Sequence, residues 1–247
     1  MDVSAVGFSG GDRTTIKLPA IQTKLMQALS ATGKPVIFVN CSGSAMAIPW
    51  EIEHLSAIVQ AWYPGESGGT AVADVLFGKY NPAGRLPITF YASDDDLPAF
   101  TDYSMANRTY RYFQGKPEFP FGFGLSYTTF QYSDLQLSPS VAATGTVQVN
   151  FKLTNTGAVD GEEVVQAYYH NSQPFAGAPI RSLCAFQRVA LAHGETKSVA
   201  LQIPAHNFRH WDDAKNDYVV DPGGYEIQVG GFAGDVRLKG VVQVNNK

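Results

Sequence analysis

The sequence has few charged residues of either sign. Lys, Arg, Asp and Glu make up 16% of the 247 residues, and the formal net charge is −4. Nucleic-acid binding requires a basic face, so this balance argues against a nucleic-acid partner. No apolar run approaches the roughly 18 residues that a membrane-spanning helix needs. Met1–Ala5 has neither the basic nor the apolar region of a signal peptide, so we expect no signal peptide in this chain.

Cysteine is equally scarce. Only Cys41 and Cys184 occur, too few and too far apart for a zinc cluster, and we expect two buried free thiols rather than a disulfide. His206 and His210 are spaced i, i+4, but the neighbouring Phe208 and Trp211 favour packing at the edge of a sheet. We therefore expect no metal site and no cofactor.

Carboxylates occur in short clusters without an obvious catalytic pair. The run Asp94-Asp95-Asp96 lies between Ser93 and Pro98, which favours a solvated loop, with a calcium site as the alternative. Glu162 and Glu163 open a predicted strand, and we expect both to be solvated there.

Helix and strand patterns alternate in the first part of the chain. The spacing of apolar residues predicts a helix over 20–29, and Val36–Val39 is typical of a buried strand. A second strand is predicted over 57–62 and a second helix over 70–77, with Ala71, Val75 and Leu76 facing inward. This order indicates an α/β sandwich domain with a mostly parallel sheet.

After Phe130 the pattern is all-β. Val147, Val149, Phe151 and Leu153 alternate with polar residues, which predicts a strand with one buried face. Further strands are expected over 163–169, 182–191, 196–203, 225–230 and 237–244. About seven strands over roughly 115 residues suit an immunoglobulin-like sandwich, and the lack of a Cys-Trp-Cys core favours a fibronectin type III-like one.

Between these regions lies a segment with many prolines and aromatic residues. It includes Tyr103, Tyr110, Phe113, Phe121 and Tyr127. Aromatic rings can form a platform for sugar rings. We favour the alternative, in which they hold an irregular connecting segment in place between two domains.

The stretch Trp62–Ala71 supports two functions. Gly65-Glu66-Ser67-Gly68-Gly69 is a G-x-S-x-G sequence between a predicted strand and a predicted helix, as in serine hydrolases. A serine esterase using Ser67 also needs a histidine and an oxyanion hole, and the downstream histidines lie in the predicted β-sandwich. The simpler interpretation is a glycine-rich turn that lets the helix approach its neighbours closely.

The order of motifs resembles glycoside hydrolase family 3. The similarity covers the whole chain and rests on these segments: Gly10-Gly11-Asp12-Arg13, Leu18–Gln22, Gly33-Lys34-Pro35-Val36, Trp62-Tyr63-Pro64-Gly65, Leu76–Pro87, Phe119–Phe130, Gly161–Gln166 and Pro222–Tyr225. The opening Gly7–Arg13 and the run Arg108–Tyr112 are most similar to the β-xylosidase and β-glucosidase members. The resemblance implies domains over 1–90 (α/β sandwich), 91–130 (connecting segment) and 131–247 (fibronectin type III-like).

The resemblance also implies a retaining exo-β-glycosidase that hydrolyses terminal β-linked xylosides or glucosides. In this family the nucleophile is an aspartate on an N-terminal (β/α)8 barrel, and the acid/base is a glutamate shortly before the Gly-Asp-Arg motif. Met1–Ser9 contains no glutamate. We therefore expect no catalytic residue in this chain, and little activity without a barrel that binds the oligo- or aryl-β-glycoside substrate.

Only Asp12 and Arg13 carry over from the family, as residues that hold the active-site loop in place. A stand-alone carbohydrate-binding or interaction module is the alternative function. Low charge, 24 glycines and 12% aromatic residues fit an extracytoplasmic parent protein, periplasmic or secreted.

Overall fold

The computed structural model describes residues 13–246, and the chain divides into two compact units. The first, called the α/β unit, contains residues 13–80, 88–108 and 113–119 of the described chain. The second, called the sandwich unit, contains Asn81–Pro87, Thr109–Tyr112 and the residues from Pro120 onward. The boundaries expected at residues 90 and 130 stay predictions.

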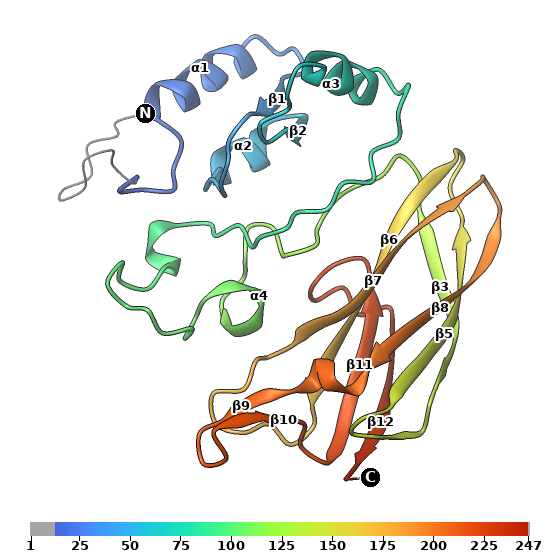
Figure 1. The fold of residues 1–247 in the computed structure, drawn as a ribbon. Helices are drawn as coiled ribbons and strands as arrows, with labels where there is room; N and C mark the ends of the chain where they lie inside the picture. The colour runs from blue at the N-terminus through green and yellow to red at the C-terminus, as the bar shows by residue number, and fades with distance from the viewer. Residues whose placement is uncertain (1–12, 247) are drawn as a thin grey trace. The chain divides into compact units, whose positions relative to one another are not determined.

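The α/β unit contains the predicted alternation of helices and strands (Figure 1). Its elements are α1 (Ala20–Ser30), β1 (Ile37–Asn40), α2 (Pro49–His54), β2 (Ala57–Gln60), α3 (Gly68–Leu76) and the 3-10 helix η1 (Asp94–Asp96). Strands β1 and β2 pair in parallel, with Ile37 opposite Ala57. The expected α/β class with a parallel sheet is confirmed, although the sheet of the described residues has only these two strands.

Helix α1 buries little of its apolar face. Met26 is 7% exposed, whereas Ile21, Leu25 and Leu29 are 72%, 59% and 46% exposed. The last three follow one another at i, i+4 and i+8, so they form a single stripe on the helix. In α3, Ala71 is exposed rather than inward-facing, and the prediction for that residue is wrong.

The sandwich unit has two main sheets. Strands β3 (Phe130–Leu137), β5 (Thr146–Asn155) and β8 (Thr196–Pro204) form one; β4 (Ser140–Ala142), β12 (Leu238–Asn245), β11 (Gly223–Gly230), β6 (Gly161–Asn171) and β7 (Ser182–Leu191) form the other. The remaining elements are α4 (Thr109–Tyr112), the 3-10 helix η2 (Ala205–Phe208) and the hairpin strands β9 (His210–Asp212) and β10 (Asp217–Val219).

The core of the sandwich follows the alternation in the sequence. Val147, Val149, Phe151 and Leu153 of β5 are each at most 2% exposed, and the residues between them face solvent. Inward-facing residues of β6, β7, β8, β11, β12 and η2 complete one continuous apolar cluster. Burial of each such side chain contributes about 1.5–3 kcal/mol, so this cluster accounts for much of the unit's stability. The predicted all-β sandwich is confirmed.

Strand β3 and the β9–β10 hairpin were not expected. In β3 the pairing register shifts between Ser133 and Gln136, and Asp134 has a φ of +57°. This bulge interrupts the alternation of inward and outward residues that identifies a strand in sequence. The hairpin strands have three residues each, too few for a recognisable period.

Both cysteines are free, as predicted. Cys41 is exposed, so the expectation of two buried thiols is wrong for that residue. Burial raises the pKa of the Cys184 thiol, which keeps it protonated at neutral pH.

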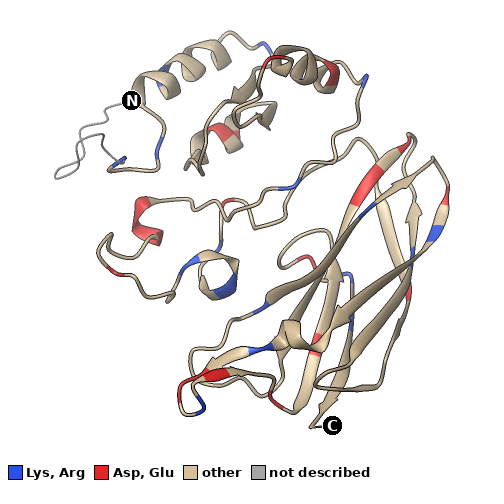
Figure 2. Ribbon diagram, viewed as in Figure 1, with Lys and Arg blue, Asp and Glu red and all other residues tan. Residues whose placement is uncertain are grey.

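The charged residues are scattered over the described part of both units, and no run of Lys and Arg forms a basic stripe there (Figure 2). Among residues 13–246, no helix is long and apolar enough to cross a membrane. The same residues contain no group of three or more His, Cys, Asp or Glu side chains that could hold a metal ion.

Candidate functional site

The Arg13 side chain binds the loop that follows β1. Its guanidinium donates hydrogen bonds to the Ser44 hydroxyl and to the Ala45 carbonyl oxygen (3.2 Å), and it also contacts the Met46 sulfur. These contacts lie 31 to 33 residues apart in sequence. A guanidinium that contacts several groups of one loop fixes the direction of that loop better than a single donor would. Asp12, the other expected loop-supporting residue, lies outside the described residues.

Asp94 holds the segment after Arg13 from the other side. Its carboxylate accepts hydrogen bonds from the Ile16 backbone N–H and the Thr15 hydroxyl, both at 2.8 Å, and Lys17 Nζ lies 3.8 Å away. Partial burial opposes ionisation, but these bonds and the positive charges of Lys17 and Arg13 outweigh it and lower the pKa of Asp94. Sequence inspection missed this role, because nothing local distinguishes Asp94 from Asp95 or Asp96.

The segment also joins the loop through its backbone. Ala47 N–H donates to the Ile16 carbonyl at 2.9 Å, and Lys17 and Ala47 form a parallel β-bridge. A cavity of about 220 Å³ lies here, lined by Arg13–Thr15, Lys17–Pro19 and Met46. The segment around Arg13 is therefore held in place by hydrogen bonds, and it lies beside a small cavity.

Two carboxylates lie near the start of α2, Glu51 buried and Glu118 half-buried. Glu118 accepts hydrogen bonds from the Ile48 backbone N–H at 3.0 and 3.1 Å, and Glu51 accepts one from the Thr23 hydroxyl at 2.7 Å. Burial, with a smaller contribution from the charge of Glu51, raises the pKa of Glu118 to about 7 against the opposing effect of the Ile48 N–H. Glu118 thus binds the free N–H of a helix start, a structural role.

Ser67 lies in the turn before α3, with φ −90° and ψ 14°, and makes no side-chain capping bond to the helix. In a nucleophile elbow the serine itself occupies the strained turn position. Here the positive φ angles belong to Trp62 (+55°) and Gly65 (+49°). His54, in the same unit, hydrogen-bonds through Nδ1 to the Trp50 carbonyl and stacks on the Trp50 ring. The esterase hypothesis stays a prediction that this geometry does not favour.

The Asn81–Pro87 motif is tied into the sandwich unit. The Asn81 side chain donates to the Asp160 carbonyl at 2.8 Å and accepts hydrogen bonds from the Ser126 hydroxyl and the Tyr127 N–H. Leu86 N–H donates to the Phe123 carbonyl at 2.9 Å. The Asn81–Pro87 motif and the Phe123–Tyr127 segment are therefore joined by hydrogen bonds, and together they are called the strap.

Arg85 and Glu163 form a buried ion pair within the same unit. Arg85 Nη2 lies 3.0 Å from Glu163 Oε2, and the side chains are 10% and 8% exposed. The Tyr132 hydroxyl donates to the other carboxylate oxygen at 3.2 Å. The expectation of a solvated Glu163 is wrong, while Glu162 pairs with Arg188 at 2.7 Å in a more exposed position. The period of β6 was a usable signal, because Glu163 shares a face with Val165.

The aromatic residues of the connecting segment have mixed surroundings. Tyr110 stacks on Phe121 with ring centroids 4.4 Å apart, and Phe113 is 8% exposed. Tyr103 and Tyr127 are 90% and 52% exposed. Packing accounts for some of these rings and not for others.

Two family profiles match this chain. The glycosyl hydrolase family 3 C-terminal domain matches residues 3–127, and the fibronectin type III-like domain matches residues 163–233. The first match covers the α/β unit together with the strap, and the second lies within the sandwich.

Curated relatives are similar over almost the whole chain. The chain is 48% identical to a xylan 1,4-beta-xylosidase of Xylanibacter ruminicola, over 97% of this chain and 27% of that protein. It is 36% identical to a periplasmic beta-glucosidase of Salmonella typhimurium, over 92% of this chain and 32% of that protein. The chain thus spans about a third or less of the length of these relatives.

Solved structures show the same fold. A beta-glucosidase of Streptomyces venezuelae, crystallised with D-glucose, is 32% identical with a TM-score of 0.87, over 96% of this chain and 32% of that one. A family 3 beta-glucosidase of Bifidobacterium adolescentis is 29% identical with the same TM-score, over 96% of this chain and 37% of that one.

Proposed function

Because this chain belongs to glycosyl hydrolase family 3 and carries that family's C-terminal domain, we propose that it forms part of a retaining exo-β-glycosidase. The substrate is a terminal β-linked xyloside or glucoside. The observation that carries the proposal is the similarity to β-xylosidases and β-glucosidases over more than nine-tenths of the chain. The 48% identity to a xylan 1,4-beta-xylosidase favours xylose over glucose.

In this proposal both catalytic carboxyl groups lie outside the chain. Retaining hydrolysis needs two carboxyl groups about 5–5.5 Å apart, one as nucleophile and one as acid/base. Two carboxylates of the α/β unit that are at least half-buried have other partners: Glu118 binds the Ile48 N–H and Glu51 binds the Thr23 hydroxyl. The nucleophile then belongs to a (β/α)8 barrel and the acid/base to a segment upstream of Met1.

The exposed stripe of α1 supports a contact with such a barrel. Ile21, Leu25 and Leu29 place large apolar side chains in water along one helix face. Removal of such a stripe from water by a partner is favourable by about 25 cal/mol per Å² of apolar area. A barrel that covers this face would explain why large apolar side chains of α1 are exposed to solvent in the α/β unit.

Arg13 is proposed to act as a positioning residue in the complete enzyme. It binds Ser44 and Ala45, and so fixes the start of the described chain against the loop after β1. A glutamate shortly upstream of Arg13 would thereby also be held in a defined position. A 1 Å displacement of a reacting group can lower the rate about 100-fold, so this tie affects turnover without touching substrate.

The proposed parent enzyme is extracytoplasmic. One relative is named a periplasmic beta-glucosidase. The low charge and high glycine content agree with this.

The first experiment measures hydrolysis of p-nitrophenyl β-D-xylopyranoside and the matching glucopyranoside by the 247-residue chain alone. The expected rate equals that of buffer, because loss of either catalytic carboxylate removes several orders of magnitude in rate. Turnover at about 1 s⁻¹ or faster, an ordinary enzymatic rate, would contradict the proposal.

The second experiment is a chimera in which this chain replaces the matched 27% of the Xylanibacter ruminicola protein. The proposal expects β-xylosidase activity, with the β-anomer as the first product in an NMR time course. An inactive but folded chimera, or an α-anomeric product, counts against it.

Arg13→Ala in the chimera tests the positioning role. We expect kcat to fall about 10- to 100-fold while KM changes little. Lys24→Ala is the matched control, since Lys24 is an exposed cation of the same unit and should leave kcat unchanged. Equal effects of the two substitutions would remove the assignment of Arg13.

A further inference from the structure

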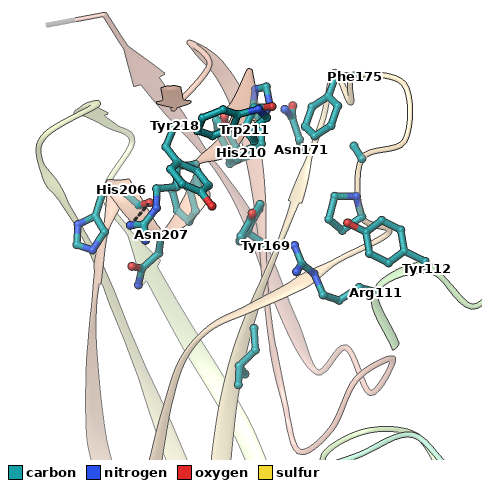
Figure 3. Close-up of a pocket in the computed structure, with 16 residues that line it drawn as sticks. Arg111, Tyr112, Tyr169, Asn171, Phe175, His206, Asn207, His210, Trp211 and Tyr218 are labelled. Carbon is teal, nitrogen blue, oxygen red and sulfur yellow. Dashed lines mark hydrogen bonds between the residues drawn. The ribbon is translucent and has the colours of Figure 1, made fainter. Parts of the chain in front are cut away.

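The sandwich unit contains a cavity of about 640 Å³. It lies between the β9–β10 hairpin, η2, α4 and the end of β6 (Figure 3). This volume is within the roughly 300–1,000 Å³ of small-ligand sites. The proposed glycosidase function assigns no role to it.

Aromatic rings form one side of the cavity. Trp211 and Tyr218 are directly opposite residues of the β9–β10 hairpin, with ring centroids 5.3 Å apart, and they are 47% and 59% exposed. Phe175 stacks on His210 at 4.1 Å and is 38% exposed. In Figure 3 the Trp211, Tyr218 and His210 side chains gather in one part of the cavity. Large aromatic faces left in water are typical of binding surfaces.

Other residues that line the cavity carry hydrogen-bonding groups. Arg111 Nε donates to the Ser182 hydroxyl at 3.2 Å, which orients the guanidinium, and its Nη groups remain as further donors. Asn171 Oδ1 accepts the Gln173 N–H at 2.9 Å, which leaves the amide nitrogen of Asn171 as a donor. His206 also lines the cavity and offers a ring nitrogen as donor or acceptor. Such groups suit a ligand rich in hydroxyls.

Several charged side chains of the hairpin and its flank have partners. Asp213 accepts from Trp211 Nε1 at 2.8 Å, His210 Nε2 lies 2.8 Å from Asp221, and Lys215 lies 2.9 Å from Asp212. No Asp or Glu is among the residues that line the cavity. The site therefore offers no carboxylates to a metal or a cationic ligand, and its hairpin is held in shape by its own pairs.

We propose that this cavity binds a short, uncharged oligosaccharide. The half-exposed Trp211 ring stacks against the apolar C–H face of a sugar ring, with Tyr218, whose ring is also contacted by the Arg209 guanidinium, beside it. Arg111, Asn171 and His206 bind its hydroxyls. The inference goes beyond the proposed hydrolysis, because the sandwich unit holds the sugar and breaks no bond. Only the choice of test sugars follows from the proposed function.

Titration calorimetry of the 247-residue chain with xylotriose and cellotriose tests the inference. At least one sugar should bind with a dissociation constant of about 1 mM or below, equivalent to −4 kcal/mol or better. Trp211 is the sandwich unit's single tryptophan, so a parallel change in tryptophan fluorescence should accompany binding and disappear in Trp211→Phe.

Three variants locate the bound sugar. Trp211→Ala should weaken binding at least about tenfold, and Asn171→Ala about threefold or more. Phe186→Ala is the matched control, because Phe186 is 69% exposed on the same unit and does not line the cavity. Circular dichroism checks folding, and Tyr218→Ala replaces Trp211→Ala if that variant unfolds.

If neither xylotriose nor cellotriose binds at about 10 mM, ten times the expected dissociation constant of about 1 mM, the inference is overturned. So does binding that Trp211→Ala and Tyr218→Ala leave unchanged. These outcomes are independent of hydrolysis: an inactive chimera with an intact binding isotherm would remove the proposed function and leave this site standing.

Discussion

The α/β unit and the sandwich unit treat their apolar residues differently. In the sandwich, the inward residues of β5 are at most 2% exposed and join one continuous cluster. In the α/β unit, α1 buries Met26 and leaves Ile21, Leu25 and Leu29 largely in water. The core strands of the sandwich therefore bury their inward apolar residues within the chain, whereas helix α1 of the α/β unit leaves an apolar face exposed.

The difference extends to the polar groups. The sandwich buries the Arg85–Glu163 pair, which would be costly to break. The α/β unit ties its Arg13 segment with Asp94, whose side chain remains 37% exposed. A unit with a complete core and a unit with an exposed apolar face should respond differently to substitution, and the variants below test this.

Phe151→Ala should have the largest effect. Phe151 is 2% exposed and stacks on Tyr132 with centroids 5.8 Å apart. The cavity left behind should lower the free energy of unfolding of the sandwich by about 4 kcal/mol. Amide hydrogen exchange of β5 and β8 measures this, with the exposed neighbour Asn150→Ala as control. A loss below about 1 kcal/mol would mean that the cluster does not dominate stability.

Arg85→Met should be next. The substitution leaves Glu163 buried without its cation, which should destabilise the sandwich by about 3 kcal/mol. The double variant Arg85→Met/Glu163→Gln should recover part of this loss, because no buried charge then remains unpaired. Denaturation with urea compares the two. Equal free energies of unfolding for the single and the double variant would show that the loss of Arg85 acts only through packing.

Glu118→Gln should change the pH dependence of the α/β unit. The pKa of Glu118 is raised to about 7, so between about pH 4.5 and 7 the unfolded state loses this proton first. Stability due to this group therefore falls as pH rises through that range. Glutamine should stabilise the unit at pH 8 by about 1 kcal/mol, after allowance for solvent screening of a half-buried group. Guanidinium denaturation at pH 5 and 8 measures the gain, with the exposed Glu53→Gln as control.

Leu25→Ser should change stability by less than about 0.5 kcal/mol, because Leu25 is already 59% exposed. Met26→Ser, one residue further and 7% exposed, should cost about 2–3 kcal/mol. Thermal unfolding compares them. In the active chimera the ranking should change, since a barrel that covers Leu25 would make Leu25→Ser costly too.

Ser67 should show the smallest effect. A fluorophosphonate probe should not label it, because the serine lacks the strained turn of a nucleophile. Mass spectrometry of the treated chain detects the adduct, and Ser67→Ala serves as the blank. Stoichiometric labelling at Ser67 would restore the esterase hypothesis.

The fold was predictable where a period or a turn repeats over several residues. Val147, Val149, Phe151 and Leu153 alternate over a full strand, and the structure buries all four. The helix over 20–30 and the parallel strand pair also follow from local pattern. Strand β3 was not predicted, because its bulge interrupts the alternation of inward and outward residues.

The sites were less accessible to sequence inspection. Arg13 was identified by its motif, but its partners Ser44 and Ala45 lie more than 30 residues away. The cavity around Trp211 draws on segments that begin at Arg111 and end at Tyr225. No short window contains such a set.

Sequence alone determined which residues prefer a helix, a strand or a turn, and which family the motifs resemble, because both depend on local order along the chain. Only the tertiary structure decided that Glu163 meets Arg85, that Asp94 holds the Arg13 segment and that Leu25 stays in water. Those outcomes depend on which distant segments approach within a few ångströms of one another. That approach is set by the packing of the whole unit, and the hydrogen-bonding capacity of a single residue does not predict it.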